Sequence, residues 1–149
     1  MDIESLLRLL NDRAAEYVVI GAVAMPMHGY SRNTLDIDIL IRPTEANVAK
    51  VMDALRAFGY DLTDTSVRDF LDYKILLRQY AVEADIHPSV KGVTFDEVWE
   101  HRVAGEYLRT PAQFASLEDL IRMKEAANRP KDQEDLRVLR ELLRRRKKP

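Results

Sequence analysis

The segment Leu35–Ile41 (LDIDILI) constrains the fold most, because acidic and apolar residues alternate along it. Successive side chains of a β-strand point to opposite sides, so Asp36 and Asp38 share one face and the apolar residues between them share the other. A strand of this kind buries its apolar face against other elements, which places it in a sheet that is covered on one side. Taken alone, the pattern favours an ordinary amphipathic edge strand whose acids face water.

The rest of the chain predicts helices and strands in succession around this strand. Helical spacing and capping residues indicate helices at Asp2–Ala15, Ala22–Gly29, Thr44–Phe58, Phe95–His101, Ser116–Asn128 and Asp132–Arg146. Short apolar or alternating runs indicate strands at Tyr17–Gly21, Tyr73–Gln79, Ala81–His87 and Glu106–Arg109. We therefore expect one α+β domain over residues 1–149, with a small mixed sheet flanked by helices and further helices at the C-terminal end.

Two local signals refine this expectation. Pro26 fits the first turn of the short helix after Gly21, where backbone N–H groups have no helical partner. Ser116 and Asp119 have the spacing of a capping box at the start of their helix, with Asp in place of the usual Glu.

Composition excludes several classes of protein. The 149 residues are 46% hydrophobic and 32% charged, which fits a globular domain with a sizeable core. The net charge of −2 excludes a uniformly basic nucleic-acid coat, and the lack of cysteine excludes disulfides, thiolate zinc sites and cysteine nucleophiles. No stretch predicts a membrane span, and the N-terminus carries acids where a signal peptide carries bases, so we expect a cytoplasmic protein.

Positive charge is concentrated at the C-terminal end. Between Arg129 and Pro149 nine bases face four acids, a net of +5, so the first 128 residues carry −7. The basic tail, residues 144–149, contains the five consecutive bases Arg144–Lys148. We favour a solvated helix end, where bases suit the negative end of the helix dipole, over the alternative of a contact to RNA or DNA phosphates.

The acids of two predicted strands are the main candidates for chemistry. Asp36 and Asp38, with Cα atoms about 7 Å apart on one face of a strand, can converge on a hard cation such as Mg²⁺. Asp85 can join them if its strand is a neighbour, and it could bind metal and accept a proton from an attacking hydroxyl. Glu83 is the rival acid on that strand. His87 shares a face with Asp85 on the same strand. The following Pro88, however, indicates that His87 only marks the end of the strand.

Candidate phosphate contacts surround these acids. A strand that enters a helix through Gly21-Ala22 presents free backbone N–H groups at the positive end of the helix dipole. Arg32 and Thr34 offer a cation and a hydroxyl just before the acids, although a solvated loop explains them equally well. Lys124 lies within the apolar stripe of its helix, so it either extends to water or points into an acidic or phosphate-filled cleft. His28 and His101 have no ligand-spaced partner and are interpreted as packing or surface residues.

Together these residues resemble a known superfamily. Gly21-Ala22, thirteen intervening residues, Asp36-Ile37-Asp38 and the later Asp85 resemble the nucleotidyltransferases of the DNA polymerase β type. The segments Gly21–Ile41 and Ser116–Asp135 are similar to a small prokaryotic branch that contains abortive-infection nucleotidyltransferase toxins. Members of the superfamily usually have Gly or Ser where this chain has Ala22, so a backbone contact to phosphate is kept and a hydroxyl contact is not.

The resemblance implies a fold, a metal and a set of roles. Catalytic acids would lie on strands of a mixed sheet, with Asp36 and Asp38 binding Mg²⁺, and Asp85 completing a second metal site and helping to activate the acceptor hydroxyl. Two ions are implied, with Mn²⁺ as the alternative metal. The residues implied to contact the nucleotide are Gly21, Ala22, Arg32, Thr34, Lys124 and, without a defined role, Asp132.

Three functions follow as hypotheses. The favoured one is a metal-dependent nucleotidyltransferase that moves a nucleoside monophosphate from an NTP to a hydroxyl on RNA, protein or a small molecule, with release of pyrophosphate. The alternative is a catalytically relaxed binding module that acts as a toxin–antitoxin or regulatory partner of another protein. The third is a nucleic-acid-binding protein that uses the basic tail.

Overall fold

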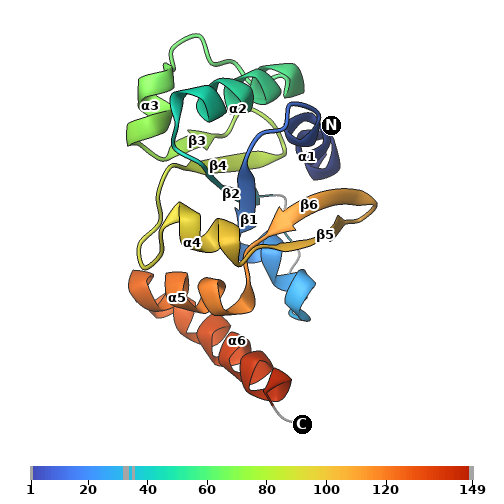
Figure 1. Ribbon diagram of the computed structural model, residues 1–149, viewed down its shortest axis with the longest axis vertical. Helices are drawn as coiled ribbons and strands as arrows, with labels where there is room; N and C mark the ends of the chain where they lie inside the picture. Colours follow the sequence, from blue (N-terminus) through green and yellow to red (C-terminus); the bar gives the residue numbers. More distant parts are fainter. Residues whose placement is uncertain (1, 32–33, 35, 148–149) are drawn as a thin grey trace.

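The computed structural model of the protein describes residues 2–31, 34 and 36–147 (Figure 1). Arg32, a predicted phosphate contact, lies outside the described residues. The helices are α1 (Ile3–Asp12), α2 (Glu45–Phe58), α3 (Val67–Asp72), α4 (Phe95–Glu100), α5 (Leu117–Ala127) and α6 (Gln133–Arg146), with 3₁₀ helices η1 (Gly21–His28) and η2 (Pro130–Asp132). The strands are β1 (Tyr17–Ile20), β2 (Asp36–Ile41), β3 (Ile75–Leu77), β4 (Glu83–His87), β5 (Val103–Tyr107) and β6 (Thr110–Phe114).

The strands form one mixed six-stranded sheet in the order β3-β4-β2-β1-β6-β5. Strands β3 and β4 form an antiparallel hairpin, and β5 and β6 form another. In the centre, β1 is antiparallel to β2, whereas β2 runs parallel to β4 and β1 runs parallel to β6. Helices flank this sheet and follow it at the C-terminal end, so the α+β prediction is confirmed.

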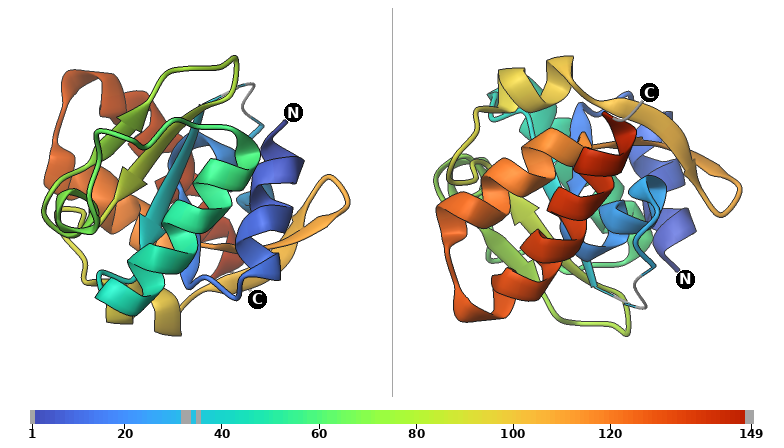
Figure 2. Two further views of the ribbon diagram at one scale, coloured as in Figure 1. Left: turned by 90° about the horizontal axis from the view of Figure 1, so that it is seen from above. Right: turned by 90° about the horizontal axis from the view of Figure 1, so that it is seen from below.

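Helices cover the sheet on both sides. Figure 2 shows α1 and α2 side by side on one side of the sheet, and α5 and α6 side by side on the other. The described helices are too short or too polar to cross a membrane. The apolar face of β2 is turned toward α1. The acidic face of β2 thus lies on the other side of the sheet, where α5 and α6 pack.

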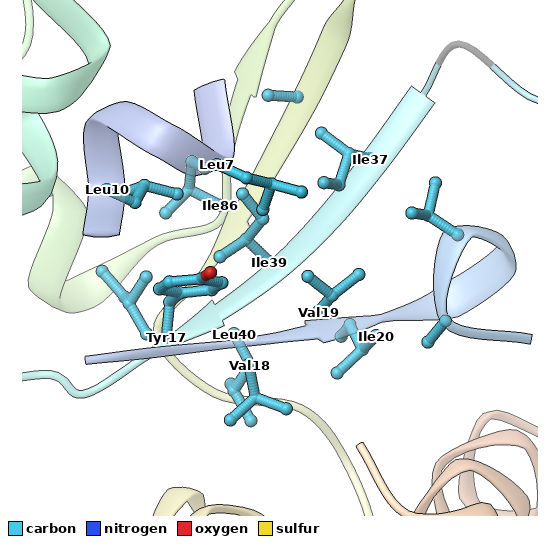
Figure 3. Close-up of a cluster of buried hydrophobic side chains, with 14 of the residues drawn as sticks. Leu7, Leu10, Tyr17, Val18, Val19, Ile20, Ile37, Ile39, Leu40 and Ile86 are labelled. Carbon is cyan, nitrogen blue, oxygen red and sulfur yellow. The ribbon is translucent and has the colours of Figure 1, made fainter. Parts of the chain in front are cut away.

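The alternation of β2 and the amphipathic stripe of α1 build the core together. Figure 3 shows Leu7 and Leu10 of α1 on the same side of the sheet as Tyr17 and Ile39, while Leu40 lies on the opposite side. All five side chains are at most 1% exposed. Burial of such side chains contributes about 1.5–3 kcal/mol each, so this packing holds β2, and the acids on its other face, in place.

Three elements differ from the sequence-based expectation. The strand expected at Glu106–Arg109 has other bounds, since β5 covers Val103–Tyr107 and a turn through Leu108, whose φ is 54°, follows it. Strand β6 after this turn was not predicted. Helix α3 was not predicted, although Ser66 and Asp69 form a complete capping box at its start. Both unpredicted elements are only five or six residues long, too short for periodicity to reveal.

The predictions for Pro26 and for the capping box at Ser116 are corrected in part. The helix after Gly21 is a 3₁₀ helix, and Pro26 lies in its second half rather than in its first turn. Ser116 accepts a hydrogen bond from the backbone N–H of Asp119 at 3.1 Å, as predicted. The Asp119 carboxylate does not return to the Ser116 backbone, however, because it binds His101 and Arg122 instead.

The C-terminal end of α6 is tied to the rest of the domain. Arg144 and Arg145 pair with Glu141, and Arg146 donates a hydrogen bond to Nδ1 of His28 at 2.8 Å. His28 is 6% exposed and its other ring nitrogen bonds the carbonyl oxygen of Ala115. His28 is thus a packing residue, as expected, and it docks part of the basic tail against η1.

Candidate functional site

Asp38 and Asp85 face one another across two parallel strands. The register of β2 and β4 pairs Asp38 with Asp85, and it pairs Asp36 with Glu83 two positions earlier. Neighbouring strands of a sheet lie about 4.7–4.9 Å apart, so side chains at paired positions on one face are close together. The sheet thus brings together two of the three predicted catalytic acids, from positions 47 residues apart in the chain.

His87 joins this pair. Its Nε2 lies 2.9 Å from Oδ1 of Asp38, and the ligand atoms of Asp38, Asp85 and His87 all lie within 4.8 Å of one another. The side chains of residues 85 and 87 point to the same face because they are two positions apart on a strand. The sequence pattern indicates this shared face, but Pro88 indicated only a strand end at His87. The parallel pairing of β4 with β2 cannot be seen in the sequence.

Gly21 makes room for the Asp38 carboxylate. Its φ is +70°, and a β-carbon at this position would lie 2.6 Å from Oδ2 of Asp38. Only glycine adopts such a backbone conformation without strain while leaving this space open. The turn from β1 into η1 therefore passes directly beside the acid pair, as the proposed role of Gly21 requires.

A cleft of about 510 Å³ opens beside the acids, between the sheet and the C-terminal helices. Its lining includes most of the predicted site residues, namely Gly21, Ala22, Asp38, Asp85, Lys124 and Asp132. His87 and the bases Lys74, Arg129 and Lys131 line it as well. The cleft thus brings acidic and basic side chains together. This arrangement suits a polyanion that is bound together with a cation.

Lys124 points inward to two carboxylates. Its Nζ lies 3.0 Å from Oδ1 of Asp132 and 3.2 Å from Oδ2 of Asp135. Arg129 also donates to Asp132, at 2.7 Å, and this hydrogen bond, followed by that of Lys124, holds the pKa of Asp132 well below its usual range. The Asp132 side chain is 1% exposed, so these bonds fix η2 against α5 at the edge of the cleft.

Arg129 connects this cluster to the acids of the sheet. The pKa of Arg129 is raised, mainly by its hydrogen bond to Asp132, and the charge of Asp38 adds to the effect. Lys74 and Lys131 are exposed and form no ion pair within the described part of the chain. These two lysines are therefore the bases of the cleft wall whose charges are most available to a ligand.

A further cation, Arg78, occupies the other side of Asp85. Its guanidinium lies 2.5 Å from Oδ1 of Asp85 and 3.2 Å from Oε2 of Glu83. The hydrogen bond to Asp85 is the main reason that the pKa of Arg78 is raised, and the charge of Asp36 contributes to it. Glu83, the rival acid of the sequence analysis, is thus engaged by Arg78 and does not line the cleft described above.

Asp36 and Thr34 lie at the start of β2, outside the lining of the cleft. The Thr34 hydroxyl accepts a hydrogen bond from the backbone N–H of Asp36 at 3.0 Å, and Asp36 is exposed. The structure thus places Asp36 on the same face as Asp38 but does not bring it into the group formed by Asp38, Asp85 and His87. Its predicted role in metal binding, like that of Thr34 in phosphate contact, stays a prediction.

The donor set of the group fits a divalent cation. Two carboxylates and an imidazole are common ligands of divalent ions. Arg78 already pairs with Asp85, so a divalent ion would compete with it for that carboxylate. Nε2 of His87 and Oδ1 of Asp38 form a hydrogen bond at 2.9 Å, so both atoms could bind one ion when the proton between them is absent.

The sheet thus carries two facing carboxylates beside a glycine turn, and a cleft lies next to them. The class of the protein is given by the family that its sequence matches. Residues 1–144 match a family described as nucleotidyltransferase of unknown function (DUF6036), and the chain belongs to that family. No curated protein matches the chain.

Proposed function

We propose that the protein is a metal-dependent nucleotidyltransferase, which transfers a nucleoside monophosphate from an NTP to a hydroxyl group and releases pyrophosphate. The observation that carries this proposal is the pairing of Asp38 with Asp85 in a cleft that also holds Gly21. The family match supports the reaction class, although it names no substrate.

The reaction is an in-line displacement at phosphorus. The oxygen of the acceptor hydroxyl forms a bond to the α-phosphorus while the bond from that phosphorus to the bridging oxygen of pyrophosphate breaks. Asp85 is the acid we assign to accept the hydroxyl proton. A divalent cation bound by Asp38 and Asp85, and by Asp36 if a second ion is taken up, would neutralise charge on the phosphate oxygens.

The cleft wall supplies the contacts for the triphosphate. The turn at Gly21-Ala22 offers backbone N–H groups, and Lys74 and Lys131 offer cations opposite the acids. Lys124 is assigned a supporting role here, since Asp132 and Asp135 already engage its ammonium group. The sequence-based role of Lys124 as a direct nucleotide contact is therefore less favoured than the same role for Lys131.

Transfer of label tests the reaction. The purified chain is incubated with each α-³²P-labelled NTP, with Mg²⁺ or Mn²⁺, and with total RNA, protein extract or small hydroxyl compounds as acceptors. We expect one nucleotide to label one acceptor class, with pyrophosphate released in equal amount. Asp38→Asn and Asp85→Asn should each reduce transfer by at least about 100-fold, in keeping with the loss of charge at a reacting centre.

A matched control separates loss of chemistry from loss of a surface charge. Asp64 is exposed and lies outside the cleft, so Asp64→Asn should transfer label at the wild-type rate. Tight NTP binding without transfer to any acceptor would instead favour the alternative of a catalytically relaxed binding module.

A further inference from the structure

We infer that His87 is a direct metal ligand, and that the site formed with Asp38 and Asp85 therefore takes Mn²⁺ in preference to Mg²⁺. This inference rests on the proposed function, because it concerns the ion that would serve the same cleft. It adds an imidazole to the carboxylates expected from the sequence, and it makes Mn²⁺, there the alternative to Mg²⁺, the preferred ion.

The backbone places the imidazole beside the acids. Strand β4 ends at His87, two positions after Asp85. The parallel register pairs Asp85 with Asp38 and His87 with Leu40, and the imidazole reaches back to Asp38 at 2.9 Å. The His87 side chain is 15% exposed, compared with 21% for Asp85 and 32% for Asp38. His87 thus lines the cleft with its ring held among polar groups rather than extended into water.

The atoms are spaced as ligands of one ion. Nε2 of His87 and Oδ1 of Asp38 are 2.9 Å apart, and the Asp85 carboxylate lies within 4.8 Å of both. The first distance is that of a hydrogen bond, and a cation that replaced its proton could be bound by both atoms.

The mixture of donor atoms selects the metal. Mg²⁺ takes oxygen ligands and dehydrates reluctantly, whereas first-row transition ions accept imidazole nitrogen. Carboxylates suit Mn²⁺ as well as Mg²⁺. A site of two carboxylates and one imidazole therefore favours Mn²⁺ over Mg²⁺.

Pulsed electron paramagnetic resonance of the Mn²⁺-loaded protein tests whether the imidazole is bound. A directly coordinated imidazole gives strong ¹⁴N modulation, and labelling the protein with ¹⁵N-histidine replaces that signal without any mutation. His87→Gln keeps an N–H donor for Asp38 but removes the imidazole. His101→Gln is the matched control, because His101 also pairs with an aspartate, Asp119 at 3.0 Å, but lies outside the cleft.

The inference predicts histidine nitrogen modulation in the wild type and in His101→Gln, and its loss in His87→Gln. The affinity for Mn²⁺, measured by calorimetry, should fall at least about tenfold in His87→Gln, while that for Mg²⁺ changes less than about twofold. Bound Mn²⁺ without histidine modulation in the wild type would overturn the inference, and so would modulation that persists in His87→Gln. If label transfer still depended on Asp38 in that case, the proposed function would stand; failure of both metal binding and transfer would overturn both.

Discussion

The α-carbon of Gly21 lies so close to Asp38 that a β-carbon added to it would fall 2.6 Å from the carboxylate oxygen Oδ2. The end of β1 and the middle of β2 are neighbours in the sheet, and Ile20 pairs with Asp38 in their register. Glycine at position 21 is therefore needed for two reasons: it leaves space for the Asp38 carboxylate, and it allows the turn from β1 into η1.

Gly21→Ala should displace Asp38 and weaken divalent binding by at least about tenfold, since ligand atoms must be held within a fraction of an ångström. Calorimetric titration with Mn²⁺ or Mg²⁺ measures the effect. Gly29→Ala is the matched control, because Gly29 also has a positive φ, +97°, but a β-carbon there would meet only Leu142 at 3.8 Å. Both variants should lose about 1 kcal/mol of stability to backbone strain, and equal metal affinities in the two would contradict the role of Gly21.

Much of this site could be predicted from the sequence because it depends on local pattern. Alternation alone put Asp36 and Asp38 on one face of a strand, and a glycine between a strand and a helix indicated a phosphate turn. The pairing of β2 with β4 was not predictable, since strands so far apart in the chain are brought together by packing rather than by local signals. For that reason the place of His87, and the separation of Asp36 from the group, became visible only in the structure.

The fold shows the same limit. No strand was predicted at Thr110–Phe114, and this strand contains Pro111, which lacks the N–H that a sheet uses. In the structure β6 pairs with β1 only at Phe114, so Pro111 lies where β5 is the paired neighbour. Pro111 is thus tolerated because β1 does not pair with β6 at that position. Only the position of β6 relative to β1, which is tertiary information, explains this.

Lys124 and Lys131 are predicted to differ in what they contribute. Lys124→Met should lower the free energy of unfolding by about 1–3 kcal/mol, because Asp132 and Asp135 lose a partly buried partner. Lys131→Met should leave stability unchanged and weaken NTP binding about three- to tenfold, since its charge is exposed on the cleft wall. Urea unfolding and NTP titration of both variants measure the two effects. A stable Lys124→Met with weakened NTP binding would restore the direct phosphate contact predicted from the sequence.

Arg78 is predicted to compete with the metal for Asp85. Arg78→Gln removes a cation 2.5 Å from that carboxylate, so the affinity for a divalent ion should rise about three- to tenfold. Arg68→Gln, which breaks an exposed ion pair with Asp72 on α3, should leave the affinity unchanged. Calorimetry at low ionic strength compares the two variants. An unchanged or lower affinity in Arg78→Gln would show that Arg78 positions Asp85 rather than competing for it.

The stability of the fold is predicted to depend on pH through His28. Burial lowers the pKa of His28 below its ordinary value of 6.5, and the charge of Arg146 lowers it further. As the pH falls below about 6.5, the unfolded chain therefore takes up a proton that the folded chain does not, and the folded state loses stability. Above about pH 7 this contribution is fully present.

Urea unfolding between pH 7.5 and about pH 5 should thus show a falling free energy of unfolding, and His28→Gln should make the decline shallower. A decline of equal slope in the wild type and in His28→Gln would contradict the assignment.

We propose that Asp38 and Asp85 hold a divalent cation that binds together with a nucleotide. Calorimetric titration of the protein with each NTP, in the presence of Mn²⁺ or Mg²⁺ and then of a chelator, tests this beside an Asp38→Asn/Asp85→Asn double variant. We expect NTP binding that requires the metal and is lost in the folded double variant. Binding of an NTP with equal affinity in the chelator, or in the double variant, would contradict it.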